Sequence, residues 1–379
     1  MSLIISHISS SQHPIPLERI VRDTHAYLFD NDKISFLESR KVKNFDKNAI
    51  SIYDLIDKIM PATQEKGFDV VAARFKKNMA IASIVANNQP IPMTGTGSLE
   101  EAISNLFKIA IGHSFNEDDR IKFAQMMQAG RIPPSIVESI FKNIDDLQPK
   151  VMRTAIFLTF QLLRTGSVNY LDPRTAINAR MDYNFMPSLF PAPLTGATTW
   201  DKPLTANALE DLEEHLEVYR EINGYDPDFI VMRRKNWRNV RRQESTRRAL
   251  VSESLASNAT NGDSAVSLAQ MKKLFAQREL PEPVILDGRV QIEPQPGRMI
   301  NVNLMNDNEY FFANRGMGNR VFGNTIESDK KGTNYKSGIH VDLDPFKSTD
   351  TEEKVVAIGR FIPVIDDPKT MGARVTHQL

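Results

Sequence analysis

The sequence contains no cysteine, and this absence excludes several kinds of chemistry. A chain without thiols forms no disulfide, uses no thiolate nucleophile and holds no zinc through sulfur. The chain also has no net charge, because 47 lysines and arginines balance 47 aspartates and glutamates. No global field therefore draws it to nucleic acid or to a membrane surface.

Long hydrophobic runs are missing as well. No apolar stretch approaches the roughly 20 residues that a helix needs to cross a bilayer. The N-terminal run MSLIISHISSSQHPIP has neither the basic start nor the sustained apolar core of a signal peptide. We therefore expect a soluble protein that is made and used in a cytoplasm, with no membrane partner. Its 379 residues allow two or three domains.

Residues that could carry out catalysis are few and scattered. The seven histidines lack the short spacings of metal sites; they are His7, His13, His25, His113, His215, His340 and His377. The acidic stretch 342–353 fits a calcium-loop frame at four positions, but Lys347 stands where that loop needs glycine. The glycines of GMGNRVFG (316–323) miss the dinucleotide-binding spacing. The sequence therefore predicts no catalytic, cofactor-binding or metal-binding residue, no cofactor and no enzymatic activity.

Hydrophobic patterning predicts an α+β fold with long connections. Residues 1–67 have the turn-rich character of an arm that lies on another part of the molecule. Two strand-like runs, 68–75 and 79–86, precede the breaker-rich segment NNQPIPMTGTGS, and NLFKIAIGH (105–113) is the expected returning strand. We expect a long two-stranded projection over 68–112 that needs a neighbour, because an isolated hairpin is marginal in water.

The strongest helical signal covers residues 133–165. Ser135 and Glu138 stand at the spacing of a capping box near its start. Pro149 predicts a kink or a restart, because proline cannot donate an amide hydrogen bond. Gly166 is the expected stop.

A helix, a strand and a basic helix follow. The first has Leu209, Leu212, Leu216 and Tyr219 on one face and ends at Gly224. DFIVM then predicts a short buried strand, and residues 234–250 predict a basic helix with Trp237 packed beneath it. The basic residues of this region are Arg233, Arg234, Lys235, Arg238, Arg241, Arg242, Arg247 and Arg248.

These basic residues permit two interpretations. They can meet nucleic-acid phosphates, or they can pair with acidic residues of the preceding helix in the same subunit or in a neighbour. Those acidic residues are Glu210, Asp211, Glu213, Glu214, Glu217 and Glu221. Because the net charge is zero, we favour ion pairing and keep weak DNA contact as the secondary interpretation.

The order of these motifs resembles the major capsid proteins of tailed phages, above all the lambda-type capsid protein E family with the Hong Kong ninety-seven fold. The stretches that carry the resemblance are LLRTGSV (162–168), MDYNF (181–185), TTWDKPLTANALEDL (198–212), INGYDPDFIVMRRKNWRNV (222–240), VNLMNDNEYFFANRGMGNRVFG (302–323) and AIGRFIPVIDDP (357–368). Each motif is short, but together they cover roughly residues 68–379 in order.

The resemblance implies an architecture and a function. The implied parts are an N-terminal arm (1–67), an extended β-hairpin loop (68–112), a peripheral domain with a long spine helix (113–200), an axial domain (201–339) and C-terminal strands that return to the peripheral domain (340–379). The implied function is that of a major capsid protein, which self-assembles into pentamers and hexamers of the icosahedral head shell around the phage genome. Such a protein is a virion component that is assembled in the host bacterial cytoplasm.

The resemblance also implies partners and contact residues. The partners are other copies of the chain, a portal, a decoration protein, packaged double-stranded DNA through weak non-specific contact, and a scaffold protein. We expect a separate scaffold, because no long N-terminal coiled-coil segment is present. The expected inter-subunit contacts of the loop tip are Pro90, Pro92, Gly95 and Gly97, and those of the basic region, which could instead face the genome, are Arg233, Arg234, Lys235, Arg238, Arg241 and Arg242. The expected structural residues are Trp200, Trp237, Gly166, Gly224 and Pro363.

Two alternatives remain open at the level of sequence. An encapsulin-like nanocompartment shares the fold with phage capsids but encloses cargo. A nucleic-acid-binding protein would use the basic helix on its own. A hydrolase with a site assembled from distant residues is the weakest candidate, since no part of such a site stands out.

Overall fold

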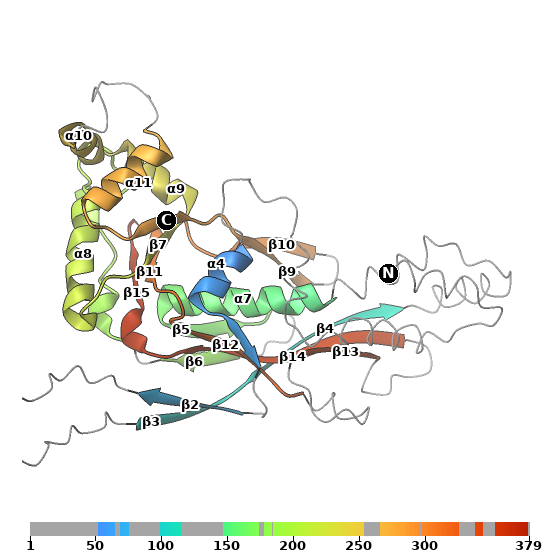
Figure 1. The fold of residues 1–379 in the computed structure, drawn as a ribbon. Coiled ribbons are helices and arrows are strands. Elements are labelled where there is room, and N and C mark those ends of the chain that lie inside the picture. The colour runs from blue at the N-terminus through green and yellow to red at the C-terminus, as the bar shows by residue number, and fades with distance from the viewer. Residues whose placement is uncertain are drawn as a thin grey trace, which may run out of the picture.

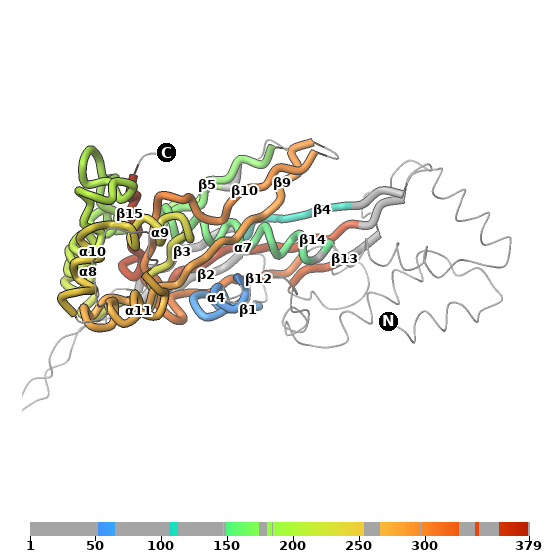
Figure 2. The backbone as a smooth tube through the Cα atoms, turned by 90° about the horizontal axis from the view of Figure 1, so that it is seen from above, coloured from blue at the N-terminus to red at the C-terminus, as the bar shows by residue number. Residues whose placement is uncertain are grey.

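The long helix α7 (Leu147–Thr165) organises the molecule (Figure 1). The computed structural model describes residues 52–64, 69–75, 99–115, 147–173, 178–183, 185–253, 266–295, 298–325, 338–343 and 353–377. The fold is α+β, as the sequence predicts. In both views the helices α8 to α11 gather at one end, and strands β4, β13 and β14 extend toward the other (Figures 1 and 2).

Helix α7 buries one face and ends abruptly. Val151, Ala155 and Leu158 recur at helical spacing, and all are at most 2% exposed. Gly166 follows in the left-handed conformation, with φ of 70°, and an added Cβ would collide with the ring of Phe185. Pro149 lies in the first turn, where its missing amide costs no hydrogen bond, so it does not kink the described helix. Residues 133–146, with Ser135 and Glu138, lie outside the described residues.

The main sheet has five strands. They are β1 (Ala62–Gln64), β4 (Phe107–Phe115), β12 (Gly318–Gly323), β13 (Ile339–Leu343) and β14 (Glu353–Ile365). Strand β14 is central: β4 runs antiparallel along one edge, and β13 and then β12 run along the other. The short β1 adds to β12 in parallel.

The expected returning strand is corrected by this sheet. Residues 107–115 form β4, which pairs with β14, so the partner of β2 (Asp69–Phe75) is instead β3 (Leu99–Asn105). The physical reason is burial. Phe107 and Ile109 of β4 pack against the main core, and in a projecting ribbon these side chains would lose that contact. The segment 79–86 lies outside the described residues.

The end of the expected arm packs into this core. Helix α4 (Ile52–Ile59) contributes Leu55, Ile56 and Ile59, each 0% exposed, to the cluster that contains α7. The expectation that this segment lies on another part of the chain is therefore confirmed for residues 52–64. Residues 1–51 lie outside the described part of the chain.

A second sheet of four strands lies between two hydrophobic clusters. Its strands, in order, are β15 (Gly372–Val375), β11 (Glu309–Ala313), β7 (Phe229–Met232) and β8 (Glu282–Ile285). In β7, Phe229 and Val231 join the cluster around α7, whereas Ile230 and Met232 join the cluster under the helices. The buried strand predicted from DFIVM is thus confirmed, and both of its faces are covered.

Four helices cover the outer face of this sheet. They are α8 (Ala208–Asn223), α9 (Arg234–Arg242), α10 (Glu244–Ser252) and α11 (Leu268–Gln277). The single basic helix expected over 234–250 is wrong, because it breaks at Gln243. The side-chain amide of this buried residue makes two hydrogen bonds with backbone groups near the start of α8. Its Oε1 accepts from the Ala208 N–H at 2.7 Å, and its Nε2 donates to the Trp200 carbonyl at 3.3 Å.

Two hairpins complete the described elements. The first joins β5 (Ser167–Leu171) to β6 (Asn178–Asp182). The second joins β9 (Arg289–Gln295) to β10 (Arg298–Asn303) and follows β8. Three single-turn 3-10 helices occupy Pro187–Leu189, Gly196–Thr198 and Pro368–Thr370.

Candidate functional site

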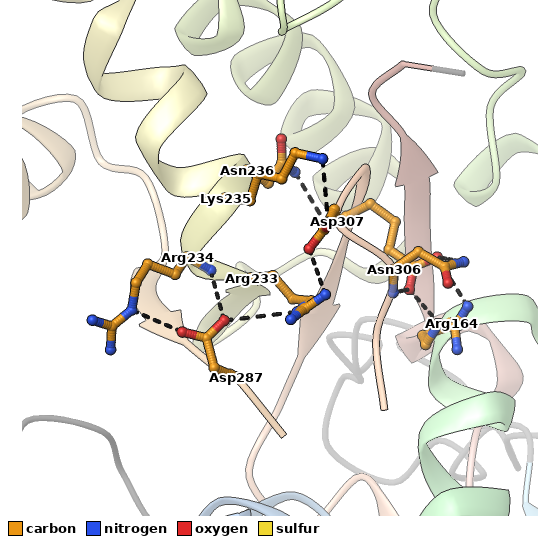
Figure 3. Close-up of polar contacts among 9 residues, drawn as sticks. Arg164, Arg233, Arg234, Lys235, Asn236, Asp287, Asn306 and Asp307 are labelled. Carbon is orange, nitrogen blue, oxygen red and sulfur yellow. Dashed lines mark hydrogen bonds and ion pairs between the residues drawn. The ribbon is translucent and has the colours of Figure 1, made fainter. Parts of the chain in front are cut away.

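The N-terminus of α9 carries a network of ion pairs (Figure 3). Arg233, which is only 6% exposed, pairs with Asp307 and lies 3.7 Å (Nε to Oδ1) from Asp287. Asp287 also accepts from the backbone N–H of Arg234 at 3.2 Å and from its Nε at 2.8 Å. Lys235 Nζ lies 3.4 Å from the second oxygen of Asp307. Two carboxylates of the same subunit therefore offset two of the three positive charges at the start of α9, and Asp287 also satisfies one of the free amides of its first turn.

A second group of polar contacts lies beside this network and reaches α7 (Figure 3). Arg164, in the last turn of α7, donates from Nη2 to Glu309 Oε2 at 3.2 Å and from Nη1 to the Leu304 carbonyl at 3.2 Å. Glu309 also accepts from the backbone N–H of Asn306 at 2.6 Å. Since Asp307 lies between Asn306 and Glu309, the short segment before β11 connects the spine helix to the start of α9.

The rest of α9 presents cations without such partners. Arg238 and Arg242 are exposed and Arg241 is half-buried. Within the described residues no ion pair reaches any of the three. The cations at and within α9 thus divide into a start, at residues 233–235, that is ion-paired with Asp287 and Asp307, and the three arginines Arg238, Arg241 and Arg242, which have no ion pair among the described residues.

Pairing between α8 and α9 within one subunit is not what the described residues show. On α8, Glu213 pairs with Arg278, just after α11, at 2.9 Å, and Asp211 accepts from Trp200 Nε1 at 2.7 Å. The partners of the α9 start are instead Asp287 and Asp307, more than 50 residues further along the chain. No sequence motif marks these two aspartates, since their position follows only from the packing of β8 and β11 beside β7.

The two tryptophans lie in the cluster under the helices. Trp200 is 0% exposed and stacks on Tyr310, with ring centroids 5.2 Å apart and planes 7° apart. Trp237 is 2% exposed and lies 5.5 Å from Phe275 of α11. Gly224 ends α8 in the left-handed conformation, with φ of 74°. These residues fix the position from which α9 presents its cations.

Pro363 lies in β14 just past the end of β4, whose pairing stops at Phe361. Its missing N–H therefore leaves no neighbouring strand without a donor. The buried Tyr183 hydroxyl donates to the carbonyl of Pro363. The loop-tip residues Pro90, Pro92, Gly95 and Gly97 lie outside the described residues.

The described part of the chain holds no group of three or more His, Asp or Glu side chains placed to bind a metal ion. Among the same residues, no helix is long and apolar enough to cross a membrane. This site can bind anionic groups, because it presents guanidinium groups on a helix whose start is anchored by partly buried ion pairs.

His215 is a buried histidine with a structural role. Its Nε2 lies 3.1 Å from the Leu189 carbonyl and its Nδ1 lies 3.0 Å from the Tyr310 hydroxyl. Because a carbonyl can only accept, Nε2 carries the proton and Nδ1 accepts from Tyr310. Burial lowers the pKa of His215 to about 4, and the positive charge of Arg374 adds to this effect.

We predict a pH-dependent loss of stability from this histidine. Between pH 4 and 6.5 the unfolded chain binds more protons at His215 than the folded chain does, so the free energy of unfolding falls as the pH drops through this window. At pH 5 the loss is about 2 kcal/mol. Urea unfolding of the wild type and of His215→Gln at pH 7 and pH 5 measures it, and the variant is expected to lose about 2 kcal/mol less. An equal pH dependence in both proteins would contradict the assignment.

Comparison with known proteins gives likeness in structure alone. No protein-family model matches the sequence, and no curated protein matches it. A candidate prophage capsid protein from Escherichia coli CFT073 superposes with a TM-score of 0.52 at 12% identity, covering 94% of this chain and 98% of that one. A phage-related protein from Bordetella bronchiseptica RB50 gives 0.45 at 11% identity, with 85% and 91% covered. The capsid of the myovirus XM1 gives 0.43 at 12% identity, with 91% and 98% covered. The superposition on the prophage capsid protein shows that the chain has the α+β fold of a phage capsid protein.

Proposed function

We propose that this chain is the major capsid protein of a tailed phage and assembles into the pentamers and hexamers of an icosahedral head. The observation that carries the proposal is the extent of the shared fold, which spans 94% of this chain and 98% of the prophage capsid protein. In this role the chain acts by contact and needs no chemical step.

The elements of the structure can be assigned to the domains predicted from the sequence. We infer a peripheral domain around α7 and β14, and an axial domain around α8 to α11. Residues 1–67 would be an arm whose end docks on the subunit through α4. The extended loop, predicted over 68–112, would contain the β2–β3 ribbon and end before β4, which belongs to the main sheet. In this division β15 belongs with the axial sheet rather than with the peripheral strands, since it pairs with β11.

Shell formation also suits the physics of these parts. A ring of identical subunits needs heterologous contacts whose rotation closes. Each contact can be weak, because several contacts engaged together give a large avidity. A two-stranded ribbon is marginal alone and is stabilised when it lies on a neighbouring subunit.

The remaining partners are part of the same proposal. A separate scaffold, a portal, a decoration protein and packaged double-stranded DNA are the molecules that a head shell would meet. The place of action would be the virion, after assembly in the bacterial cytoplasm.

Removal of residues 85–98 tests the proposed loop. Because this deletion spares β2 and β3, we expect a folded subunit, with circular dichroism and thermal midpoint near those of the wild type. Closed particles, counted by negative-stain microscopy, should fall at least about tenfold, since an inter-subunit contact is lost at every copy. Normal particle numbers from the deletion would contradict the role given to Pro90, Pro92, Gly95 and Gly97.

A further inference from the structure

Helix α8 carries an exposed row of negative charge. Glu210, Glu214, Glu217 and Glu221 are all exposed and follow one another at spacings of four, three and four residues. On a helix this spacing aligns them on one side, over about 16 Å at 1.5 Å per residue. We call these four residues the acidic ridge. The opposite side of the same helix, which includes Leu212 and Leu216, is buried in the hydrophobic cluster between the helices and the four-stranded sheet.

Helix α9 carries a row of the opposite sign. The exposed Arg238 and Arg242 stand four residues apart, and the half-buried Arg241 lies beside them. We call these three residues the basic ridge. Its start is rigidly anchored, because the preceding turn is tied to Asp287 and Asp307 and because Trp237 is buried between α9 and α11.

Each ridge is unfavourable in an isolated subunit. Like charges at positions i and i+4 of a helix destabilise it, and both ridges contain such pairs: Glu210 with Glu214, Glu217 with Glu221, and Arg238 with Arg242. In the described part of the chain no ion pair joins α8 to α9, and the hydrogen bond from Asn207 to Glu210 does not change that charge. Glu217 is attracted by Arg220, but Arg220 is hydrogen-bonded to Asp226. No ion pair among the described residues offsets the charge of either ridge.

We propose that the basic ridge of one subunit docks on the acidic ridge of the next copy around the ring. The inference rests on the proposed function, because the partner is a second copy of this chain. The two ridges have opposite charge, and the basic ridge, about 6 Å from Arg238 to Arg242, is short enough to lie within the acidic row of about 16 Å. They lie on different helices, which is the condition for a heterologous contact that repeats around a closed ring.

A second copy fits the observations better than DNA does. DNA would satisfy the basic ridge but would leave the acidic ridge without a partner. The start of α9 would add three cations to a phosphate-binding surface, but Asp287 and Asp307 offset two of those charges within the subunit. A neighbouring subunit satisfies both ridges in one contact.

Two complementary variants test the contact between chains. The first, Arg238→Glu with Arg242→Glu, has two acidic ridges. The second replaces all four glutamates of the acidic ridge (Glu210→Arg, Glu214→Arg, Glu217→Arg and Glu221→Arg) and has two basic ridges. Each variant alone is expected to associate at least about tenfold more weakly than the wild type, because every ring contact then joins like charges. An equimolar mixture should recover association to within about threefold, since alternating copies again join opposite charges. Only contact between chains produces this recovery on mixing.

Association is measured by sedimentation velocity and native mass spectrometry on full-length chains. Recovered rings should contain even numbers of subunits with the two variants in equal amounts. Lys273→Glu is the matched control, because it makes the same kind of charge change at an exposed position of α11. It should associate like the wild type. Circular dichroism of each variant ensures that lost association is not lost folding.

The outcomes separate this inference from the proposed function. If the folded variants fail to recover on mixing, or if each alone associates normally, the ridge contact is wrong even where the wild type forms shells. If Arg238→Glu with Arg242→Glu keeps normal association but loses binding to a double-stranded DNA fragment, the basic ridge is a nucleic-acid surface and the inference is overturned. If the wild type forms rings that obey the mixing test but no closed shell, the ridge contact stands and the proposed function fails.

Discussion

Replacement of Asp57 by alanine is expected to lower the free energy of unfolding by about 3–5 kcal/mol. Asp57 pairs with the guanidinium of Arg320, whose side chain is only 1% exposed, while Asp57 itself is 45% exposed. Removing the carboxylate leaves a buried cation that keeps a hydrogen bond from Nε to the Met60 carbonyl at 2.8 Å but has lost its anionic partner. Burial lowers the pKa of Arg320, as expected for a site that disfavours charge.

Guanidinium chloride unfolding measures this loss, and two controls make it specific. Asp54→Ala changes an exposed aspartate on the same helix and should cost about 0.5 kcal/mol or less. Arg320→Met combined with Asp57→Ala should be more stable than Asp57→Ala alone, because it removes the buried charge rather than isolating it. If Asp57→Ala is no less stable than Asp54→Ala, the pair does not anchor α4 to the main sheet.

Replacement of Trp200 by alanine is expected to cost about 3–5 kcal/mol, since it empties a fully buried position of the second cluster. The ring stacks on Tyr310, and its Nε1 donates to Asp211 at 2.7 Å. Burial raises the pKa of Asp211, and this hydrogen bond opposes the rise. The variant therefore loses apolar contact and also weakens the stabilisation of a half-buried carboxylate.

Trp200→Phe separates the two contributions. It keeps most of the apolar contact but leaves Asp211 without its indole donor, so we expect a loss of about 1–3 kcal/mol. Urea unfolding followed by circular dichroism gives both values. A loss from Trp200→Ala that is no larger than that from Trp200→Phe would show that packing on Tyr310 contributes little.

Elements with strong local periodicity were predictable from the sequence. The buried face of α8 follows from Leu209, Leu212, Leu216 and Tyr219, because an apolar residue every third or fourth position has one helical solution. The strand at 229–232 follows from a short apolar run between turn residues. In both cases the tertiary structure agrees with the local pattern.

Features that depend on distant contacts were not predictable. Gln243 breaks the basic helix because its amide is drawn to the start of α8, 35 residues away, and a glutamine carries no breaking signal of its own. Strand β4 joins β14 rather than β2, and this choice depends on a core assembled from both ends of the chain. Asp287 and Asp307, which pair with the start of α9, are likewise placed by contacts between distant parts of the chain.

Helix α11 is different, because its signal is present in the sequence. Ser267 and Gln270 form a capping box in which each side chain binds the backbone N–H of the other residue. Met271, Leu274 and Phe275 then follow at helical spacing and are buried. Helix α11 was therefore predictable from the sequence, although it is not among the elements predicted above.

The central claim is that this fold acts by binding copies of itself. Sedimentation velocity of the full-length chain, purified alone and after co-expression with a candidate scaffold, tests it most directly. We expect rings of several subunits and closed particles of many more, with negative-stain images of hollow shells from the same fractions. A single 42.9-kDa species at every concentration, with and without the scaffold, would contradict the account.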